Sequence, residues 1–270
     1  MHAAAAASEL PSATTRRQVR FGHLWVDALT FDDALAQIVA LVGAGRGGSV
    51  FTPNVDHVVT AEDDPAFREA CGAADLMLPD GQPLVWASRL LGARLPAKVS
   101  GSDLVWPLME RAVALRWRVY LLGGAPGVGL AAARRLEQEL GVCVVGVEDG
   151  VIPLDAPAGA PDLALDRACA ARPDLVLVAL GSPKQERWIH RALPRLRPAV
   201  AVGVGASLDF LTGRARRAPR WMSRAGLEWL HRLWREPRRL AVRYLWKDPR
   251  FLGVLLRTAL RPRVERVRGA

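Results

Sequence analysis

Two kinds of hydrophobic pattern alternate along most of the chain. Short apolar runs bounded by Gly, Pro or Asp are typical of buried strands, and longer segments with apolar residues three and four positions apart are typical of helices. Strands are expected over residues 19–26, 49–51, 75–78, 118–122, 142–147, 174–180 and 199–204. Helices are expected over residues 31–42, 55–71 with a break near Asp64-Pro65, 82–91, 104–115, 128–140, 162–171 and 183–193. This alternation predicts an α/β fold with a Rossmann-like, mostly parallel sheet and helices on both faces.

The C-terminal segment differs in character from the rest. Its pattern predicts three short helices, at about 219–235, 237–247 and 249–260. The formal net charge of the chain is +10, but residues 214–268 hold 17 Lys or Arg against four acids, so this segment carries +13 and the remainder −3. We therefore expect a disordered leader over 1–18, an α/β core over 19–212 and a basic helical appendage over 213–270.

The basic appendage predicts association with an anionic membrane surface. Its expected helices carry cationic stripes beside Leu and four Trp, and each cation close to such a surface contributes about 1 kcal/mol. A solvated face on packing helices is the alternative, and it accounts less well for so many cations. No apolar run is long enough for a membrane span, and the arginines near the N-terminus follow the apolar part, the reverse of a secretory signal.

Polar loops follow several of the expected strands, at the sheet edge where α/β proteins bind ligands. The stretch from Gly181 to Glu186 follows a central strand and opens a helix, so it presents free backbone N–H groups. Asp80 follows another apolar strand, in the turn Pro79-Asp80-Gly81, where it is as readily a turn residue as a proton acceptor. The polar run Thr52-Pro53-Asn54-Val55-Asp56-His57 has a similar position, which is a usual place for substrate contacts, and alone it is explained more simply as an N-cap and turn.

Two further loops are suited to a phosphate. The segment from Lys98 to Asp103 precedes a helix, whose N-terminal amides attract anions. The turn Gly123-Gly124 belongs to a Rossmann-like strand–loop–helix unit, but its glycines do not match the dinucleotide fingerprint. This unit is therefore consistent with binding of a phosphate or nucleotide nearby, but it gives little support for binding of NAD.

Seven short motifs occur in order between about residues 21 and 256, and together they resemble the WecG/TagA/CpsF glycosyltransferases (glycosyltransferase family 26). The motifs are Thr52-Pro53-Asn54, Pro79-Asp80-Gly81, Val99-Ser100-Gly101-Ser102-Asp103, Leu122-Gly123-Gly124, Gly181-Ser182-Pro183-Lys184-Gln185-Glu186, Arg217-Ala218-Pro219 and Glu228-Trp229-Leu230-His231-Arg232-Leu233. Each motif alone is weak, whereas the ordered set is specific.

The resemblance implies an inverting, metal-independent transfer of an N-acetylmannosamine-type or related hexose residue from a UDP-sugar to a sugar on undecaprenyl diphosphate. Such a product feeds teichoic acid, common antigen, capsule or exopolysaccharide assembly. The implied location is the cytoplasm, with peripheral association to the inner face of the cell membrane. No cofactor and no nucleic-acid partner are expected, and the oligomeric state stays open, a homo-oligomer included.

The resemblance also implies roles by position. Asp80 matches the family's proposed general base, and Thr52 and Asn54 match its acceptor-side pocket. Gln185 and Asp209 match donor-side positions. Arg232 and Arg239 match tail arginines thought to bind the lipid diphosphate. Lys98 stands where the family commonly has Arg, which keeps the charge but loses the bidentate fork. The predicted catalytic residues are Asp80 and Thr52, and the predicted substrate-binding residues are Asn54, Lys98, Gly101, Asp103, Gly123, Gly124, Gln185, Glu186, Asp209, Arg217, Arg232 and Arg239.

The leaving diphosphate needs its charge stabilised, and the chain has no D-x-D motif to bind a metal ion for that purpose. The three cysteines are not at metal-ligand spacing either, and we expect them as small buried residues. Backbone N–H groups at Gly101 or Gly123-Gly124, together with Lys98 and the tail arginines, are expected to supply the stabilisation. Two other functions fit part of the pattern: a nucleotide-cofactor (NAD-type) oxidoreductase that uses the Gly123-Gly124 turn, and a nucleic-acid-binding protein that uses the basic tail. The transferase accounts for more of the chain than either.

Overall fold

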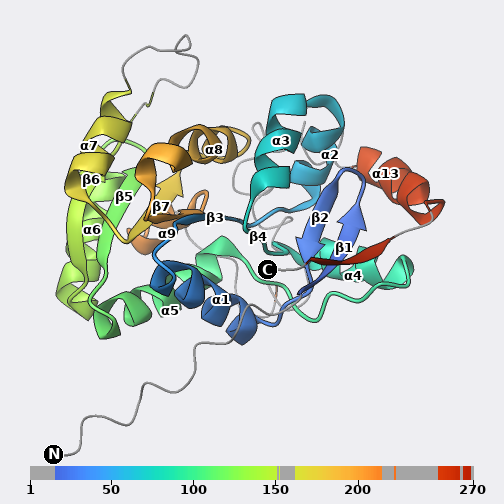
Figure 1. Cartoon of the computed structure of the whole chain (residues 1–270), viewed down its shortest axis with the longest axis horizontal. Helices are drawn as coiled ribbons and strands as arrows, with labels where there is room; N and C mark the ends of the chain where they lie inside the picture. Colours follow the sequence, from blue (N-terminus) through green and yellow to red (C-terminus); the bar gives the residue numbers. More distant parts are fainter. Residues whose placement is uncertain are drawn as a thin grey trace, which may run out of the picture.

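The computed structural model describes residues 16–150, 152, 162–214, 222, 249–261 and 264–268, and these contain two sheets (Figure 1). Six parallel strands form the larger sheet in the order β4-β3-β8-β7-β5-β6. They are β3 (Gly48–Phe51), β4 (Leu76–Met77), β5 (Arg118–Gly123), β6 (Cys143–Glu148), β7 (Leu175–Ala179) and β8 (Val200–Gly203). The predicted α/β fold with a parallel sheet is confirmed, and β7 lies near the centre of that sheet as expected.

Helices cover both faces of the larger sheet (Figure 1). Successive side chains of a strand enter opposite cores, so that Leu121 packs on one face and Leu122 on the other. On the Leu121 face lie α1 (Phe31–Gly43), α5 (Gly101–Ala114), α6 (Val128–Leu140) and the short α9 (Ser207–Leu211). On the Leu122 face lie α2 (Val55–Asp63), α3 (Pro65–Ala73), α4 (Gln82–Leu90), α7 (Leu163–Ala171) and α8 (Lys184–Leu196).

Capping residues set the beginnings of several helices. Thr30 Oγ1 accepts a hydrogen bond of 3.2 Å from Asp33 N at the start of α1. Asp64 Oδ1 accepts one of 2.9 Å from Phe67 N at the start of α3, and Pro65 occupies the first helical position, where no N–H is needed. The predicted break near Asp64-Pro65 is therefore confirmed, and it separates α2 from α3.

The segment predicted as one strand over 19–26 is a hairpin instead. β1 (Arg16–Phe21) and β2 (Leu24–Asp27) pair antiparallel, and Gly22 in the turn between them has a φ of +59°. A Cβ at this position would lie 2.5 Å from Glu62 Oε1, so glycine is required both for the conformation and for the space. β1 begins at Arg16, inside the range predicted as a disordered leader, because its first residues pair with other strands. Residues 1–15 lie outside the described part of the chain.

The C-terminal residues return to this hairpin. The helix α13 (Arg250–Ala259) packs on α2 and β1, and β9 (Glu265–Arg268) pairs antiparallel with β1, which gives a small sheet in the order β2-β1-β9 (Figure 1). The helix predicted over 249–260 is confirmed by α13. The helices predicted over 219–235 and 237–247 lie, apart from Met222, outside the described residues. The division at residue 213 remains a prediction.

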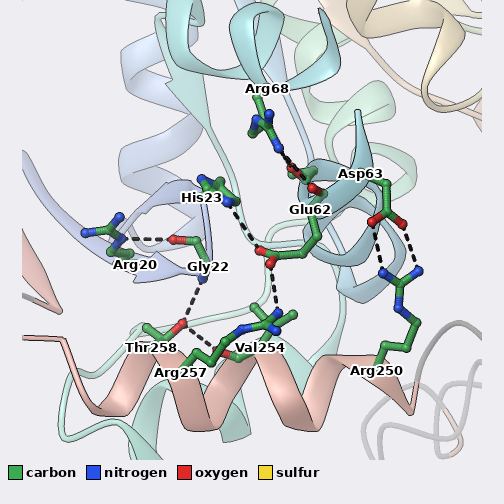
Figure 2. A network of polar contacts seen from close by, with 11 residues as sticks. Arg20, Gly22, His23, Glu62, Asp63, Arg68, Arg250, Val254, Arg257 and Thr258 are labelled. Atoms are coloured by element: carbon green, nitrogen blue, oxygen red, sulfur yellow. Dashed lines mark hydrogen bonds and ion pairs between the residues drawn. The ribbon is translucent and has the colours of Figure 1, made fainter. Parts of the chain in front are cut away.

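Charged contacts hold α13 against the end of α2 (Figure 2). Arg250 donates two hydrogen bonds to the carboxylate of Asp63, at 2.8 and 3.0 Å, and Arg257 donates one of 2.8 Å to Glu62 Oε2. These pairs are exposed on the arginine side, so each contributes modestly, and the apolar face of α13 supplies most of the packing.

Candidate active site

Backbone hydrogen bonds hold three loops side by side at the carboxyl edge of the larger sheet. Asp80 N, after β4, donates to Pro53 O, after β3, at 2.8 Å. Val99 N, just before α5, donates to Pro79 O at 2.7 Å. These bonds place Asp80 between the Thr52-Pro53-Asn54 loop and the N-terminus of α5.

A cleft of about 350 Å³ opens where these loops meet the loops after β7 and β8, and we call it the Asp80 cleft. Its lining residues are Thr52, Asn54, His57, Asp80, Gly101, Ser102, Gly181, Ser182, Gln185, Val204, Gly205, Ala206, Ser207 and Phe210. Five of the predicted site residues are among them: Thr52, Asn54, Asp80, Gly101 and Gln185. Asp80 and the Gly181 loop, which come from distant parts of the sequence, therefore face the same cleft.

A second cleft of about 340 Å³ lies beside the first, and we call it the Gly124 cleft. Its lining residues are Gly124, Ala125, Gly150, Ile152, Ala179, Leu180, Gly181, Lys184, Gly205, Ala206 and Asp209. Gly181, Gly205 and Ala206 line both clefts, so the loops after β7 and β8 form their common wall. Of the predicted residues, Gly124 and Asp209 belong to this cleft.

Close packing fixes the side of the Asp80 cleft that Thr52 occupies. Thr52 is buried, and its Oγ1 donates to Gly203 O at 3.4 Å. A Cβ on Gly101 would lie 3.3 Å from both Thr52 Oγ1 and Val204 Cα. A larger residue at this position would need the packing to give by a few tenths of an ångström, so glycine favours the close approach of α5 to Thr52, and Gly101 and Ser102 at the start of α5 line the cleft.

Asn54 has both a local and a longer-range role. It is the N-cap of α2: its Oδ1 accepts from Asp56 N at 3.0 Å and lies 2.9 Å from His57 Nδ1. The simple reading of Asn54 as an N-cap is thus correct, and the residue also lines the cleft. His57, in the third position of α2, is bound to Asn54 as a capping-box partner.

A buried polar network continues from His57 beneath the cleft. His57 Nε2 lies 3.4 Å from Glu186 Oε1, and Gln185 Nε2 donates to the same oxygen at 2.8 Å. Gln185 Oε1 accepts from Gly205 N at 3.0 Å. The network therefore joins the start of α2 to the start of α8 and to the loop after β8.

Three polar atoms in this region are buried without a hydrogen-bond partner: His57 Nε2, Ser182 Oγ and Glu186 Oε2. Buried polar atoms are nearly always paired, so such atoms call for a ligand or an ordered water. His57 and Ser182 line the cleft, so a hydroxyl-rich ligand there would have two partners ready. Glu186 is 0% exposed and does not line either cleft, so it lies behind the lining residues, and its substrate-binding role stays a prediction.

The remaining predicted residues lie around the two clefts or outside the described chain. Lys98 Nζ is 3.4 Å from Asp103 Oδ2, and Ser100 Oγ donates to the same oxygen at 2.6 Å, so Lys98 and Asp103 form one cluster at the start of α5. Gly123 has a φ of +95°, and a Cβ there would lie 2.6 Å from Ala179 O, so it serves packing against β7. Arg217, Arg232 and Arg239 lie outside the described residues, and their roles stay predictions.

His57 is one residue of the Asp80 cleft that the sequence interpretation did not single out, although it ends the polar run recognised after β3. It stands in the polar run after β3, three residues after Asn54, at the spacing of a capping box. That spacing was available in the sequence, but the approach of Glu186 from α8 depends on the tertiary fold.

The cysteines take no part in the clefts. Burial, with the nearby Glu186 carboxylate as a second cause, raises the pKa of the Cys71 thiol well above its ordinary value, so it stays neutral. Cys71 is buried as predicted, whereas Cys143 is exposed on the edge strand β6 and Cys169 is partly exposed.

Comparison with known proteins identifies the family. Residues 19–265 match the model of the glycosyl transferase WecG/TagA/CpsF family. An N-acetylglucosaminyldiphosphoundecaprenol N-acetyl-beta-D-mannosaminyltransferase of Bacillus spizizenii is 32% identical over 213 residues, which is 78% of this chain and 80% of the relative. A protein of the same name from Bacillus subtilis is 32% identical over 201 residues, 73% of this chain and 76% of the relative. The chain belongs to the WecG/TagA/CpsF family of glycosyltransferases.

Proposed function

We propose that this glycosyltransferase moves an N-acetylmannosamine-type residue from a UDP-sugar to a sugar carried on undecaprenyl diphosphate, with inversion at the anomeric carbon. The names of the two relatives support the sugar and the lipid-linked acceptor. The observation that carries the proposal is that Asp80 lines one cleft together with Thr52, Asn54 and the Gly181 loop.

The two adjoining clefts suit two substrates. The Asp80 cleft would receive the acceptor sugar, with Asn54 and Thr52 as hydrogen-bonding partners. The Gly124 cleft, at the carboxyl ends of β5, β7 and β8, would receive the nucleotide, as is general for open α/β sheets. The transferred sugar would lie against the common wall, where Gly181 and Gly205 face both clefts.

In the proposed step Asp80 acts as general base. Its carboxylate takes the proton from the acceptor hydroxyl as that oxygen bonds to the anomeric carbon from the face opposite UDP. The bond between that carbon and the diphosphate oxygen breaks, and its electron pair leaves with UDP. A well-placed base typically contributes a factor of about 10² to 10⁴ to the rate.

The charge that develops on the departing diphosphate would be met by groups that need no metal ion. Backbone N–H groups at the N-terminus of α5 are in position at the rim of the Asp80 cleft, whereas the N–H of Gly124 already donates to Ala179 O at 2.9 Å. Lys184, which lines the Gly124 cleft, adds a positive charge that the sequence interpretation did not single out. Lys98 and the tail arginines, as predicted, would complete the set.

We further propose that the protein acts while bound to an anionic membrane surface on the cytoplasmic side. None of the described helices is long and apolar enough to cross a bilayer. The helix α13 buries Phe251 and Val254 but exposes Leu252, Leu256 and the following Leu260, by 64, 69 and 87%. Exposed leucines beside arginines on an anchored helix suit insertion among lipid headgroups.

A transfer assay tests the proposal. UDP-linked N-acetylmannosamine and other UDP-sugars are offered with a short-chain prenyl-diphosphate N-acetylglucosamine acceptor, and the anomeric configuration of the product is read by NMR. We expect transfer of the mannosamine-type sugar with inversion. Retention of configuration would contradict the inverting mechanism. The absence of transfer from every UDP-sugar would contradict the assignment of a UDP-sugar as donor.

A further inference from the structure

Side chains of the small sheet bind the outer edge of β4, the strand that leads to Asp80. Among the described strands β4 lies at the edge of the larger sheet and pairs with β3 alone, so its other side would expose backbone groups. There Asp27 Oδ2 accepts from Met77 N at 2.8 Å, and two arginines donate to carbonyl oxygens just before the strand. These arginine contacts are Arg16 Nη2 to Asp75 O at 2.8 Å and Arg268 Nη1 to Ala74 O at 2.7 Å.

A continuous line of hydrogen bonds runs from the C-terminal strand to this edge. Arg266 Nε, on β9, donates to Gln18 Oε1 at 2.7 Å, and Gln18 Nε2 donates to Asp27 Oδ1 at 2.9 Å. Asp27 then accepts the backbone N–H of Met77, three residues before Asp80. The line crosses four strands in the order β9, β1, β2 and β4. In Figure 1, β1 lies between β9 and β2, and β2 lies beside β4.

The two middle groups of the link are fully buried. Gln18 and Asp27 are both 0% exposed, and such polar groups are stable inside a protein only when their hydrogen bonds are complete. With Asp27 on one side of Gln18 and Arg266 on the other, the amide has one orientation that satisfies both. These hydrogen bonds therefore have a single arrangement, in which the place of β4 depends on the place of β9.

The opposite side of the Asp80 segment is fixed by the main sheet. Leu78 N donates to Phe51 O and Asp80 N to Pro53 O, both at 2.8 Å. The segment from Ala74 to Asp80 is thus held between β3 and the small sheet. If the hydrogen bond to Asp27 is lost, this segment is held by β3 alone. A displacement of a catalytic group by about 1 Å can lower the rate about 10²-fold.

We propose that the small sheet is a positioning element for Asp80, in which Asp27 is the contact residue and β9 sets its place through Arg266 and Gln18. This inference rests on the proposed role of Asp80 as general base. It makes Gln18 and Arg266 part of the apparatus that positions Asp80, although neither of them lines either cleft.

The test uses the full-length protein and an exposed residue, so that folding is preserved. Arg266→Met removes the hydrogen bond to Gln18 and keeps an apolar stem over the Trp25 ring, to which the guanidinium now lies at 4.3 Å. Arg266→Lys restores one donor. The matched control is Glu265→Gln, its neighbour on β9, whose ion pair is a 3.5 Å contact with Arg17 on the exposed side.

Two readouts are compared: amide hydrogen exchange of residues 74–81 and steady-state transfer kinetics. For Arg266→Met we expect faster exchange in 74–81 with residues 175–204 unchanged, and a fall in kcat on the order of 10-fold with the donor KM within about twofold. Arg266→Lys should recover most of the slow exchange over 74–81 and most of kcat, and Glu265→Gln should leave the exchange and kcat unchanged.

Unchanged exchange over 74–81 in Arg266→Met would overturn the inference, whatever Asp80 does. So would an equal loss of kcat in Glu265→Gln, or faster exchange in Arg266→Met with full kcat retained. Because exchange is measured without substrate, its outcome is separate from that of the proposed function: an inactive or differently active wild type would leave the link between β9 and β4 testable.

Discussion

His57 Nε2 lies 3.4 Å from Glu186 Oε1, which brings the start of α2 and the start of α8 together beneath the Asp80 cleft. The other ring nitrogen, Nδ1, accepts from Asn54 N at 3.3 Å and lies 2.9 Å from Asn54 Oδ1, so the ring packs between Glu186 and Asn54 and supports the Asn54 cap. Asn54 in turn presents its side chain at the cleft that the acceptor is proposed to occupy.

Replacing His57 should therefore harm both stability and acceptor use. His57→Ala removes the ring beside the buried Glu186 carboxylate and the 2.9 Å contact with Asn54. We therefore expect a loss of about 1–3 kcal/mol in the free energy of unfolding. The acceptor KM should rise more than the donor KM. Urea denaturation and steady-state kinetics measure these effects, with His190→Ala on the exposed side of α8 as control. Equal changes in both KM values would contradict the proposed link to Asn54.

Gly101 provides a test of close packing at the cleft. In Gly101→Ala the new Cβ meets Thr52 Oγ1 and Val204 Cα at 3.3 Å, so the packing between the start of α5 and these two residues must give by a few tenths of an ångström. We expect a fall in kcat/KM on the order of 10-fold from this displacement. Gly72→Ala is the control, since no atom lies within 4 Å of its new Cβ. Full activity of Gly101→Ala would show that the helix position is not critical.

The exposed leucines of α13 predict how the protein meets a membrane. Replacing Leu252, Leu256 and Leu260 together by Gln should markedly reduce co-sedimentation with anionic vesicles, because each buried leucine contributes about 1.5–3 kcal/mol at most. Leu163→Gln, on α7, removes an equally exposed leucine elsewhere and should have no effect. Unchanged vesicle binding by the triple variant, or preferential salt-sensitive binding to DNA or RNA, would argue against this surface.

Asp27 predicts an unusual dependence of stability on pH. Burial raises the pKa of its carboxyl, against the opposing hydrogen bond from Met77 N and the charge of Arg16. The native state then binds this proton more tightly than the unfolded chain, so the group stabilises the fold at low pH, and that advantage is lost as the pH rises through the raised pKa.

The amide of Asp27→Asn does not titrate, so the comparison isolates this group. We expect the free energy of unfolding of the wild type, relative to Asp27→Asn, to increase as the pH falls from about 7 toward about 4. Urea denaturation at several pH values measures the difference, with Asp32→Asn at an exposed position as control. A difference that decreases on acidification would show that hydrogen bonding outweighs burial at Asp27.

Local signals were enough to predict most of the main sheet. The apolar runs of β5, β7 and β8 and the Asp64-Pro65 boundary depend on nearby residues alone, and each was found within a few positions. The loops after β3, β4 and β7 were predicted to lie together because parallel strands bring their carboxyl ends to one edge, and all three line the Asp80 cleft.

Long-range contacts explain what the sequence did not reveal. β9 has the charged sequence Glu265-Arg266-Val267-Arg268, without a buried alternating face, and becomes a strand only because β1 offers a free edge. Gly22 was not recognised as a hairpin turn, since its need for glycine arises from Glu62 and Val254 on other elements. Likewise His57 gains significance only when α8 brings Glu186 to it.

The central claim, that Asp80 accepts the proton of the acceptor hydroxyl, is tested most directly by the transfer rate of Asp80→Asn at saturating substrates, with binding of the UDP-sugar measured in parallel. The account predicts a fall in kcat of about 10² to 10⁴ with donor affinity essentially unchanged. Near-normal turnover with intact donor binding would contradict it.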